Sequence, residues 1–458
     1  MKSTQWRSWT VRHGSRTCDP ATRWASTLQR PEAHQVRETH HPGADEAGPP
    51  ITTQPEAPTP PRPPRFESFD GLRAIAALMV VVFHAAVISG FTAHHAGGIG
   101  AYTARLSAGI GVFFLISGFL LYRPFVVARL SSASSPNSGS FWIRRILRIV
   151  PAYWVVLFIS TQVLHNSGTS WTGGWAAVLT HYLFLQIYFP TQIFSGLIVS
   201  WTLCVEMSFY LFLPLYAWAV GALARKSARP PVVVEAVGAG VLIALSLTWQ
   251  LLADTRHLGI APQYQGLATI WLPAYLELFG FGMLLAITSA WFHHTDSEPL
   301  FFSHRLFPWA SWTLAAITYF VMCHLGFSPK ISLPPLTTAL AELEGLEGAF
   351  ALFLLLPAIF GPSRQGLVRR FLQCWPMAAL GVISYGLYLW HVAWCEEILH
   401  WSNFRLFGHR FPLYLVLVVG LTIIAATVSY FIVEKPALRL KRHFDWFQRG
   451  RRPAKATS

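Results

Sequence analysis

The chain has 458 residues, of which 53% are hydrophobic and only 12% are charged, whereas soluble domains carry roughly 25% charged residues. Apolar runs recur from residue 72 to residue 433, and a helix needs about 20 mostly apolar residues to cross a bilayer. This composition excludes a soluble globular protein. The net charge of +14 does not indicate nucleic-acid binding, because the basic residues cluster beside the apolar runs on one side of the expected membrane.

The first 65 residues have a different composition from the rest of the chain. They contain no apolar core, and nine prolines lie between Pro42 and Pro64. We therefore expect a disordered, cytoplasmic, proline-rich extension, with a polyproline-like stretch before the first helix and no cleavable signal peptide.

The remaining chain predicts an all-α membrane bundle of about ten transmembrane helices, over residues 66–440, followed by a basic cytoplasmic tail, 441–458. The expected spans are 72–91, 109–128, 149–165, 198–220, 232–252, 266–290, 308–326, 347–362, 377–400 and 412–433. A further apolar segment, 176–189, has only 14 residues. We interpret it as a re-entrant or interfacial segment in a long external loop.

Lysine and arginine counts set the expected orientation. With both termini in the cytoplasm, the inside loops and the C-terminal tail hold 20 basic residues and the outside loops hold 5. Positive charge collects on the cytoplasmic side of membrane proteins. We therefore expect an integral protein of a bacterial plasma membrane with cytoplasmic termini. The five cysteines form no CxxC pair and no metal-ligand spacing, so no disulfide framework and no metal site are expected. Cys204, Cys323 and Cys395 lie inside apolar runs, where we expect them to act as small packing residues.

Ionisable residues inside the apolar runs are the first candidates for function, because they are costly in hydrocarbon and tend to face a bundle interior. The informative ones are Arg73, His84, Glu206, Glu277 and His391. Each also has a plainer interpretation: an anchor at the membrane edge for Arg73, a packed histidine for His84, and a structural partner for Glu206. For Glu277 the structural interpretation is preferred, and His391 is left undecided.

The spacing of Arg73 and His84 places them on one helix face. Eleven residues at about 100° each make three turns plus about 20°, and separate the two side chains by about 16 Å along the axis. The same rise per residue places Ser117 and Glu206 about 12 Å below the outer edge of the membrane, which is the expected depth of His84.

A cationic layer is expected below that level. Arg144, Arg145 and Arg148 lie at the expected cytoplasmic mouth of the third span, level with Arg73. Guanidinium groups match phosphate oxygens in geometry and charge, although ordinary positive-inside flanking also explains such arginines. A histidine near a carboxylate can act as a general base or a nucleophile. The residues alone thus permit group transfer from a phosphorylated cytosolic donor, a proton-coupled exporter, or a non-catalytic scaffold.

Six segments, in order, carry a resemblance to a known family. The segment "FDGLRAIAALMVVVFHA", with its Arg-x10-His spacing, resembles the signature of the acyltransferase 3 family of membrane O-acyltransferases. The following segments resemble later landmarks of that family: "GIGVFFLISGFLLYRP", "RRILRIVPAYW", "SWTLCVEMSFYLFLPL", "ISYGLYLWH" and "YFIVEKP". The resemblance covers about residues 66–440.

The resemblance implies an acyl-CoA co-substrate, usually acetyl-CoA, and transfer to a hydroxyl of a carbohydrate, glycolipid or glycosylated metabolite, with no bound cofactor. By position, Arg73 and His84 are the family's Arg-x10-His pair, Glu206 is its acidic residue, and Arg144, Arg145 and Arg148 occupy its arginine motif.

On this basis the arginines would hold the CoA phosphates, and His84, oriented by Glu206, would be the base or the acyl carrier. Ser117 and Tyr385 are candidates to bind the thioester oxygen, and His391 is a candidate supporting residue. Some family members end in a soluble esterase-like domain. Because this chain ends about 24 residues after the last expected span, we expect the acceptor to meet the membrane domain directly or through a separate protein. The alternative function is a proton-coupled small-molecule exporter with a His/Glu relay.

Overall fold

The computed structural model describes residues 66–95, 98–164, 174–193, 195–254, 267–325, 336–362, 366–402 and 410–440. The predicted extension 1–65 and the predicted tail 441–458 lie outside these residues.

The described residues are helical and contain no β-strand, as predicted. The α-helices are α2 (Ser68–Ile88), α3 (Phe91–His94), α4 (Ile99–Arg105), α5 (Gly109–Leu130), α6 (Ser138–Phe158), α7 (Gly174–Tyr182), α8 (Trp201–Lys226), α9 (Pro231–Asp254), α11 (Leu272–Thr295), α12 (Phe307–His324), α13 (Leu336–Ile359), α14 (Leu367–Gln373), α15 (Trp375–Val382), α16 (Ser384–Ser402) and α17 (Phe411–Ser429). Short 3₁₀ or π segments adjoin them: η1 (Leu106–Ala108), η2 (Ile159–Val163), η3 (Gln186–Tyr188), η4 (Ile198–Ser200), η6 (Leu300–Ser303) and η7 (Tyr430–Glu434).

Seven helical runs in the described part of the chain are long and apolar enough to cross a membrane, or eight when a bent helix pair is counted as one span. They confirm a polytopic membrane bundle, but not the predicted count of about ten. The seven are Ser68–Ile88, Ile99–Leu130, Ser138–Val163, Ile198–Lys226, Pro231–Leu252, Leu272–Thr295 and Phe411–Leu440. The predicted spans 308–326 and 347–362 correspond to α12 and to the C-terminal part of α13, where the apolar helix Gly345–Ile359 is short.

The predicted span 377–400 is broken into two helices. α15 and α16 meet at Ile383 with a bend of 72°. α15 approaches α2 closely at Gly381, where a Cβ atom would overlap the backbone of Asp70. Only glycine allows this approach. Broken helices inside membranes commonly border a binding site, and the start of α16 does so here, as described below.

The third span begins eleven residues earlier than predicted, at Ser138 instead of residue 149. The reason is an N-cap: the Asn137 side chain accepts a hydrogen bond of 2.9 Å from the Ser140 backbone N–H. Such a cap satisfies one of the amide groups left free at a helix start. The arginines at 144, 145 and 148 therefore lie two to three turns inside α6.

The segment predicted to be re-entrant or interfacial, 176–189, covers most of the nine-residue helix α7, a turn, and η3. Nine residues rise only about 13.5 Å as a helix, less than half the thickness of a bilayer core, about 30 Å. This segment does not cross the membrane as a helix, in agreement with the interpretation from sequence.

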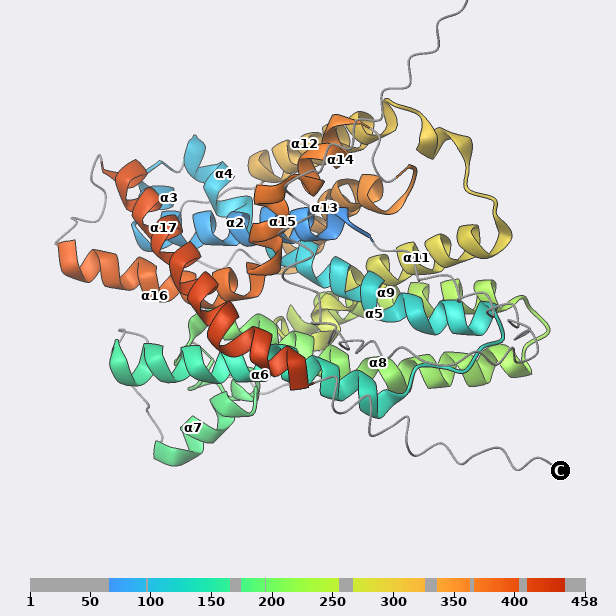
Figure 1. Ribbon diagram of the computed structural model, residues 1–458, viewed down its shortest axis with the longest axis horizontal. Helices are drawn as coiled ribbons and strands as arrows, with labels where there is room; N and C mark the ends of the chain where they lie inside the picture. Colours follow the sequence, from blue (N-terminus) through green and yellow to red (C-terminus); the bar gives the residue numbers. More distant parts are fainter. Residues whose placement is uncertain are drawn as a thin grey trace, which may run out of the picture. The chain divides into compact units, whose positions relative to one another are not determined.

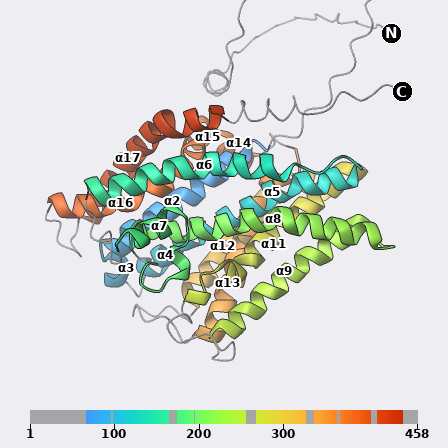
Figure 2. The ribbon, with the colours of Figure 1, turned by 90° about the horizontal axis from the view of Figure 1, so that it is seen from below.

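Close helix packing forms the centre of the bundle. α5, α9 and α11 lie side by side in both views (Figures 1 and 2). At the α5–α11 contact, a Cβ on Gly118 would overlap the Phe279 carbonyl, and a Cβ on Gly282 would overlap the Leu115 carbonyl. Small residues allow such close backbone approach in membranes. The expectation for the cysteines is confirmed, because Cys204, Cys323 and Cys395 are buried and unbridged.

A buried ion pair joins α5 to α9. The Arg129 guanidinium pairs with the Glu235 carboxylate, which is fully buried and also accepts a hydrogen bond from the Tyr122 hydroxyl. Arg129 also donates to the Ala217 carbonyl of α8. Buried charges in membranes pair in this way, so we interpret this cluster as structural.

Candidate active site

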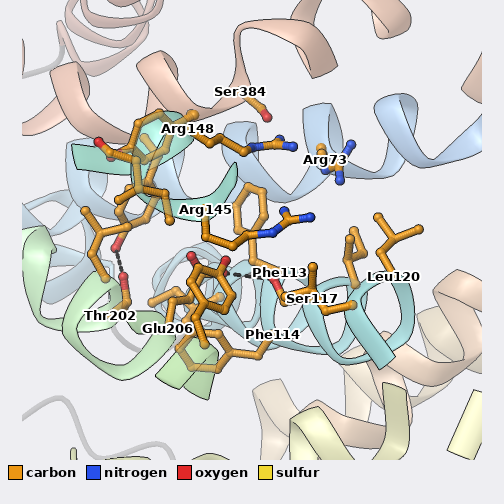
Figure 3. Close-up of a pocket in the computed structure, with 18 residues that line it drawn as sticks. Arg73, Phe113, Phe114, Ser117, Leu120, Arg145, Arg148, Thr202, Glu206 and Ser384 are labelled. Carbon is orange, nitrogen blue, oxygen red and sulfur yellow. Dashed lines mark hydrogen bonds between the residues drawn. The ribbon is translucent and has the colours of Figure 1, made fainter. Parts of the chain in front are cut away.

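A cavity lies between five helices, α2, α5, α6, α8 and α16, and Figure 3 shows the side chains that line it. Its volume, including the solvent at its open side, is about 770 Å³.

The lining residues follow helical periodicity. On α8 the cavity is lined by Thr202, Glu206 and Tyr210, each four residues from the next. On α16, directly after the bend, Ser384 and Tyr388 have the same spacing. Residues four apart share one helix face. Each helix therefore presents one polar stripe to the cavity.

Three arginines from two helices make the cavity cationic. Arg73 of α2 and Arg145 and Arg148 of α6 all line it, against the single lining carboxylate of Glu206 (Figure 3). The sequence predicted that these arginines share a level, and the structure brings these three together. Arg144, the fourth residue of the predicted layer, does not line the cavity.

The guanidinium groups are not fully neutralised by the protein. Arg73 forms an ion pair of 3.1 Å with Asp70, one turn earlier on α2. The Nε atom of Arg145 is buried without a hydrogen-bond partner, and Arg148 makes no hydrogen bond or ion pair within the described part of the chain. An unpaired guanidinium inside a membrane bundle is costly. These groups therefore fit an anionic ligand such as a phosphate.

Ser117 and Glu206 form the polar centre of the cavity. The Ser117 hydroxyl donates a hydrogen bond of 3.0 Å to Glu206 Oε1, joining α5 to α8 (Figure 3). The predicted equal depth of these two residues is thus observed. Arg145 and Arg148, which the sequence predicted to form a layer below these two residues, line the same cavity as Glu206.

Three tyrosines, a threonine and a second serine complete the polar lining, and the hydrogen bonds of three of these residues link the helices. Tyr385, a predicted candidate, lines the cavity and donates its hydroxyl hydrogen to the Ile149 carbonyl at 2.8 Å. Tyr388 and Thr202 were not predicted; their hydroxyl oxygens lie 2.5 Å apart, and Tyr388 also bonds the Val199 carbonyl. The spacing of four from Glu206 to Thr202 was the signal in the sequence that could have identified the threonine.

His84 does not line the cavity and is not paired with Glu206. Its Nδ1 atom lies 3.2 Å from Nε2 of His391 on α16 and 3.1 Å from the Val80 carbonyl. No hydrogen bond joins His84 to Glu206 among the described residues. The expected orientation of His84 by a carboxylate is therefore not formed, and His391, whose role was undecided from sequence, is the partner. Tyr388, which lines the cavity, has its ring centroid 5.8 Å from that of His391.

Glu277 lies away from this cavity, on α11. Its side chain is 1% exposed, and its Oε1 atom has no hydrogen-bond partner within the described residues. This placement separates Glu277 from the candidate site.

Comparison with known proteins gives a family match over almost the whole described region. The model of the acyltransferase 3 family, described as an acyltransferase domain, matches residues 66–434. No solved structure matches the chain.

Three relatives illustrate the similarity. The chain is 27% identical over 355 residues to "Nodulation protein 10" of Rhizobium leguminosarum bv. viciae, covering 72% of this chain and 82% of the relative. It is 26% identical over 385 residues to "Putative peptidoglycan O-acetyltransferase YrhL" of Bacillus subtilis, covering 80% of this chain and 54% of the relative. It is 22% identical over 391 residues to a "Putative O-acetyltransferase" of Staphylococcus aureus, covering 80% of this chain and 56% of the relative. The chain thus spans about half the length of the last two relatives.

Proposed function

Because the chain belongs to the acyltransferase 3 family, we propose that it is an integral membrane O-acyltransferase that uses acyl-CoA, in particular acetyl-CoA, as its donor. The acceptor is a hydroxyl group of a carbohydrate, a glycolipid or a glycosylated metabolite. The similarity to proteins named as O-acetyltransferases supports the reaction class.

The observation that carries the donor assignment is the cavity between α2, α5, α6, α8 and α16. Three guanidinium groups, of Arg73, Arg145 and Arg148, line it with one carboxylate. The phosphates of CoA are multiply charged, and guanidinium forks bind phosphate oxygens with paired hydrogen bonds. The unpartnered Nε of Arg145 supplies one donor for such a bond. We expect Arg144 to contribute less, because it lies outside the lining.

The reacting end of the donor is assigned to the neighbourhood of His84. This residue lies about 16 Å further along α2 than Arg73, on the same face, so the long pantetheine arm of CoA can connect the two. As a general base, His84 removes the proton of the acceptor hydroxyl while its oxygen attacks the thioester carbon. The C–S bond then breaks, and CoA leaves as the thiol after taking up that proton. As an acyl carrier, His84 Nε2 instead attacks the thioester carbon first, the C–S bond breaks and CoA leaves as the thiolate; the acceptor hydroxyl then takes the acyl group from the ring, and its proton neutralises the thiolate.

Two predicted roles change with the geometry. The hydroxyl hydrogens of Ser117 and Tyr385 are donated to Glu206 and to the Ile149 carbonyl, so in this structure neither is directed to a thioester oxygen. Glu206, bonded to Ser117 among the arginines, balances part of their charge and holds the polar centre of the donor cavity.

The exporter alternative depended on a relay between His84 and Glu206. His84 contacts His391, and Glu206 contacts Ser117. Because these two pairs are not joined by a hydrogen bond among the described residues, the structure offers no specific observation in favour of export.

The test uses the full chain, purified in detergent and mixed with acetyl-CoA labelled in the acetyl group. We expect slow release of CoA, and transfer of the acetyl group to added free CoA that is itself labelled in the adenine, which an exporter would not catalyse. An absence of both, in protein that retains its fold, contradicts the proposal. Mass comparison of envelope glycans and exported metabolites, with and without the gene, then identifies the acceptor.

A further inference from the structure

The contact between His84 and His391 defines where the protons of both rings lie. Nδ1 of His391 is 3.2 Å from the Leu387 carbonyl, and Nδ1 of His84 is 3.1 Å from the Val80 carbonyl. A carbonyl oxygen only accepts hydrogen bonds, so the Nδ1 atom of each ring must carry a hydrogen. Both imidazoles, when neutral, then have a free electron pair on Nε2.

This assignment makes the contact between the rings directional. Nε2 of His391, which has the electron pair, lies 3.2 Å from Nδ1 of His84, which has the hydrogen. The single hydrogen on His84 Nδ1 is therefore shared between the Val80 carbonyl and Nε2 of His391, and the contact between the rings runs from His84 to His391. The opposite tautomer of His84 would place two electron pairs, on Nδ1 and on the Val80 oxygen, against each other at 3.1 Å.

The consequence concerns the second nitrogen of His84. Nε2 has no hydrogen-bond partner within the described residues, and in this tautomer it carries the electron pair. It is therefore the atom that accepts a proton from a hydroxyl or attacks a thioester. When Nε2 gains a proton or an acyl group, the ring becomes cationic, and its Nδ1–H bond to His391 becomes charge-assisted and stronger.

We propose that His391 is the positioning residue of the active site: together with the Val80 carbonyl it holds the hydrogen of His84 on Nδ1, which leaves Nε2 as the reactive atom, and it stabilises the cationic ring that forms there. A base oriented by a third group is a recurrent arrangement in nucleophilic catalysis. Here a neutral imidazole takes the place that the sequence assigned to the Glu206 carboxylate. The inference rests on the proposed function for its kinetic part, but not for its tautomer part.

The position of His391 fits this role. It is fully buried on α16, seven residues after Ser384 and three after Tyr388, both of which line the donor cavity. His391 itself does not line the cavity. It can thus act on His84 without contacting the CoA phosphates.

The kinetic test compares two substitutions of His391 in the full chain. His391→Gln keeps an acceptor oxygen near the position of Nε2, whereas His391→Leu removes the acceptor at similar volume. We expect His391→Leu to lower kcat by about 10- to 100-fold, as loss of a hydrogen bond to a charged group does, with the KM for acetyl-CoA unchanged. His391→Gln should retain most of the rate. The control is His400→Leu, the same substitution at an exposed position of the same helix, which should leave kcat unchanged.

Equal losses for the Leu and Gln variants, or a change confined to KM, would overturn the proposal. Nitrogen NMR of the wild-type protein labelled with ¹⁵N-histidine tests the tautomer without any activity. The His84 signals, identified by their loss in His84→Ala, should show a hydrogen on Nδ1 and none on Nε2. A hydrogen on Nε2 instead would refute the positioning role. If the wild-type protein transfers no acetyl group, the proposed function fails while this measurement still decides the tautomer.

Discussion

The Ser117 hydroxyl donates a hydrogen bond of 3.0 Å to the Glu206 carboxylate, and both residues line the cavity that contains Arg73, Arg145 and Arg148. The acidic residue therefore belongs to the cavity that we propose binds the donor, whereas the pair of His84 and His391 lies outside the cavity lining. A carboxylate at this depth needs a donor or a counter-charge, and the cavity supplies both.

Substitution of Ser117 tests the importance of this bond for the fold. Ser117→Ala leaves one Glu206 oxygen without its donor, which costs about 1–3 kcal/mol. We expect a lower thermal unfolding temperature in detergent. Thr318→Ala is the control, because the Thr318 hydroxyl is exposed and bonds only the Leu314 carbonyl of its own helix. Equal stabilities of the two variants would show that Glu206 does not depend on Ser117.

Substitution of Arg145 tests whether the cavity binds the donor. Arg145→Ala removes a guanidinium from the cavity, and a hydrogen bond to a charged group contributes about 1.5–3 kcal/mol. We expect the KM for acetyl-CoA to rise by about 10- to 100-fold, with less change in the KM for the acceptor. Arg144→Ala is the matched control, since Arg144 does not line the cavity. An effect on the acceptor alone would assign Arg145 to acceptor binding.

Substitutions at Arg129 and Glu235 test whether this buried ion pair, which lies outside the site, stabilises the fold. Breaking such a pair costs about 3–5 kcal/mol, because it leaves one charge without a partner, whereas replacing both residues by apolar ones is often neutral. We expect Glu235→Leu to unfold at a much lower temperature than the wild type. The double variant, Arg129→Met with Glu235→Leu, should recover the unfolding temperature of the wild type. The folded fraction of either variant should keep its KM for acetyl-CoA. A double variant no more stable than the single one would contradict this account.

The orientation of the protein is a prediction from its loop charges. A reporter that is active only outside the cytoplasm, such as alkaline phosphatase, should be inactive when fused after residue 440, because 20 basic residues lie on the expected inner side and 5 on the outer side. The same reporter fused after residue 254 should be active. Activity at the C-terminal fusion would invert the orientation and place the arginine cavity nearer the outer surface.

The sequence predicted helix faces and depths better than helix ends and partners. The shared depth of Ser117 and Glu206, and the grouping of Arg145 and Arg148 with Arg73, follow from counting residues at a fixed rise per residue. The early start of α6 depends on the Asn137 cap, a local hydrogen bond that hydropathy does not register. Counting depth from the sequence also did not show that the arginines and Glu206 line one cavity.

The sequence could not predict the contact between His84 and His391, for a different reason. The residues are 307 positions apart, on α2 and α16, and their contact depends on the bend between α15 and α16. That bend, 72° at Ile383, lies in a run that reads as a single apolar span. A depth comparison with error of a few residues could equally pair His84 with Glu206. Only the packing of the helices decides between them.

The central claim is that His84 carries out acyl transfer from acyl-CoA. The most direct measurement is transfer of labelled acetyl from acetyl-CoA to endogenous acceptors in membranes that contain wild-type protein, His84→Ala or His95→Ala, at equal levels of inserted protein. His95 is exposed and lies eleven residues further along the chain. We predict that His84→Ala lowers the transfer rate at least about 100-fold, which is the contribution expected of a general base. His95→Ala should keep the wild-type rate. Undiminished transfer by His84→Ala would contradict the account.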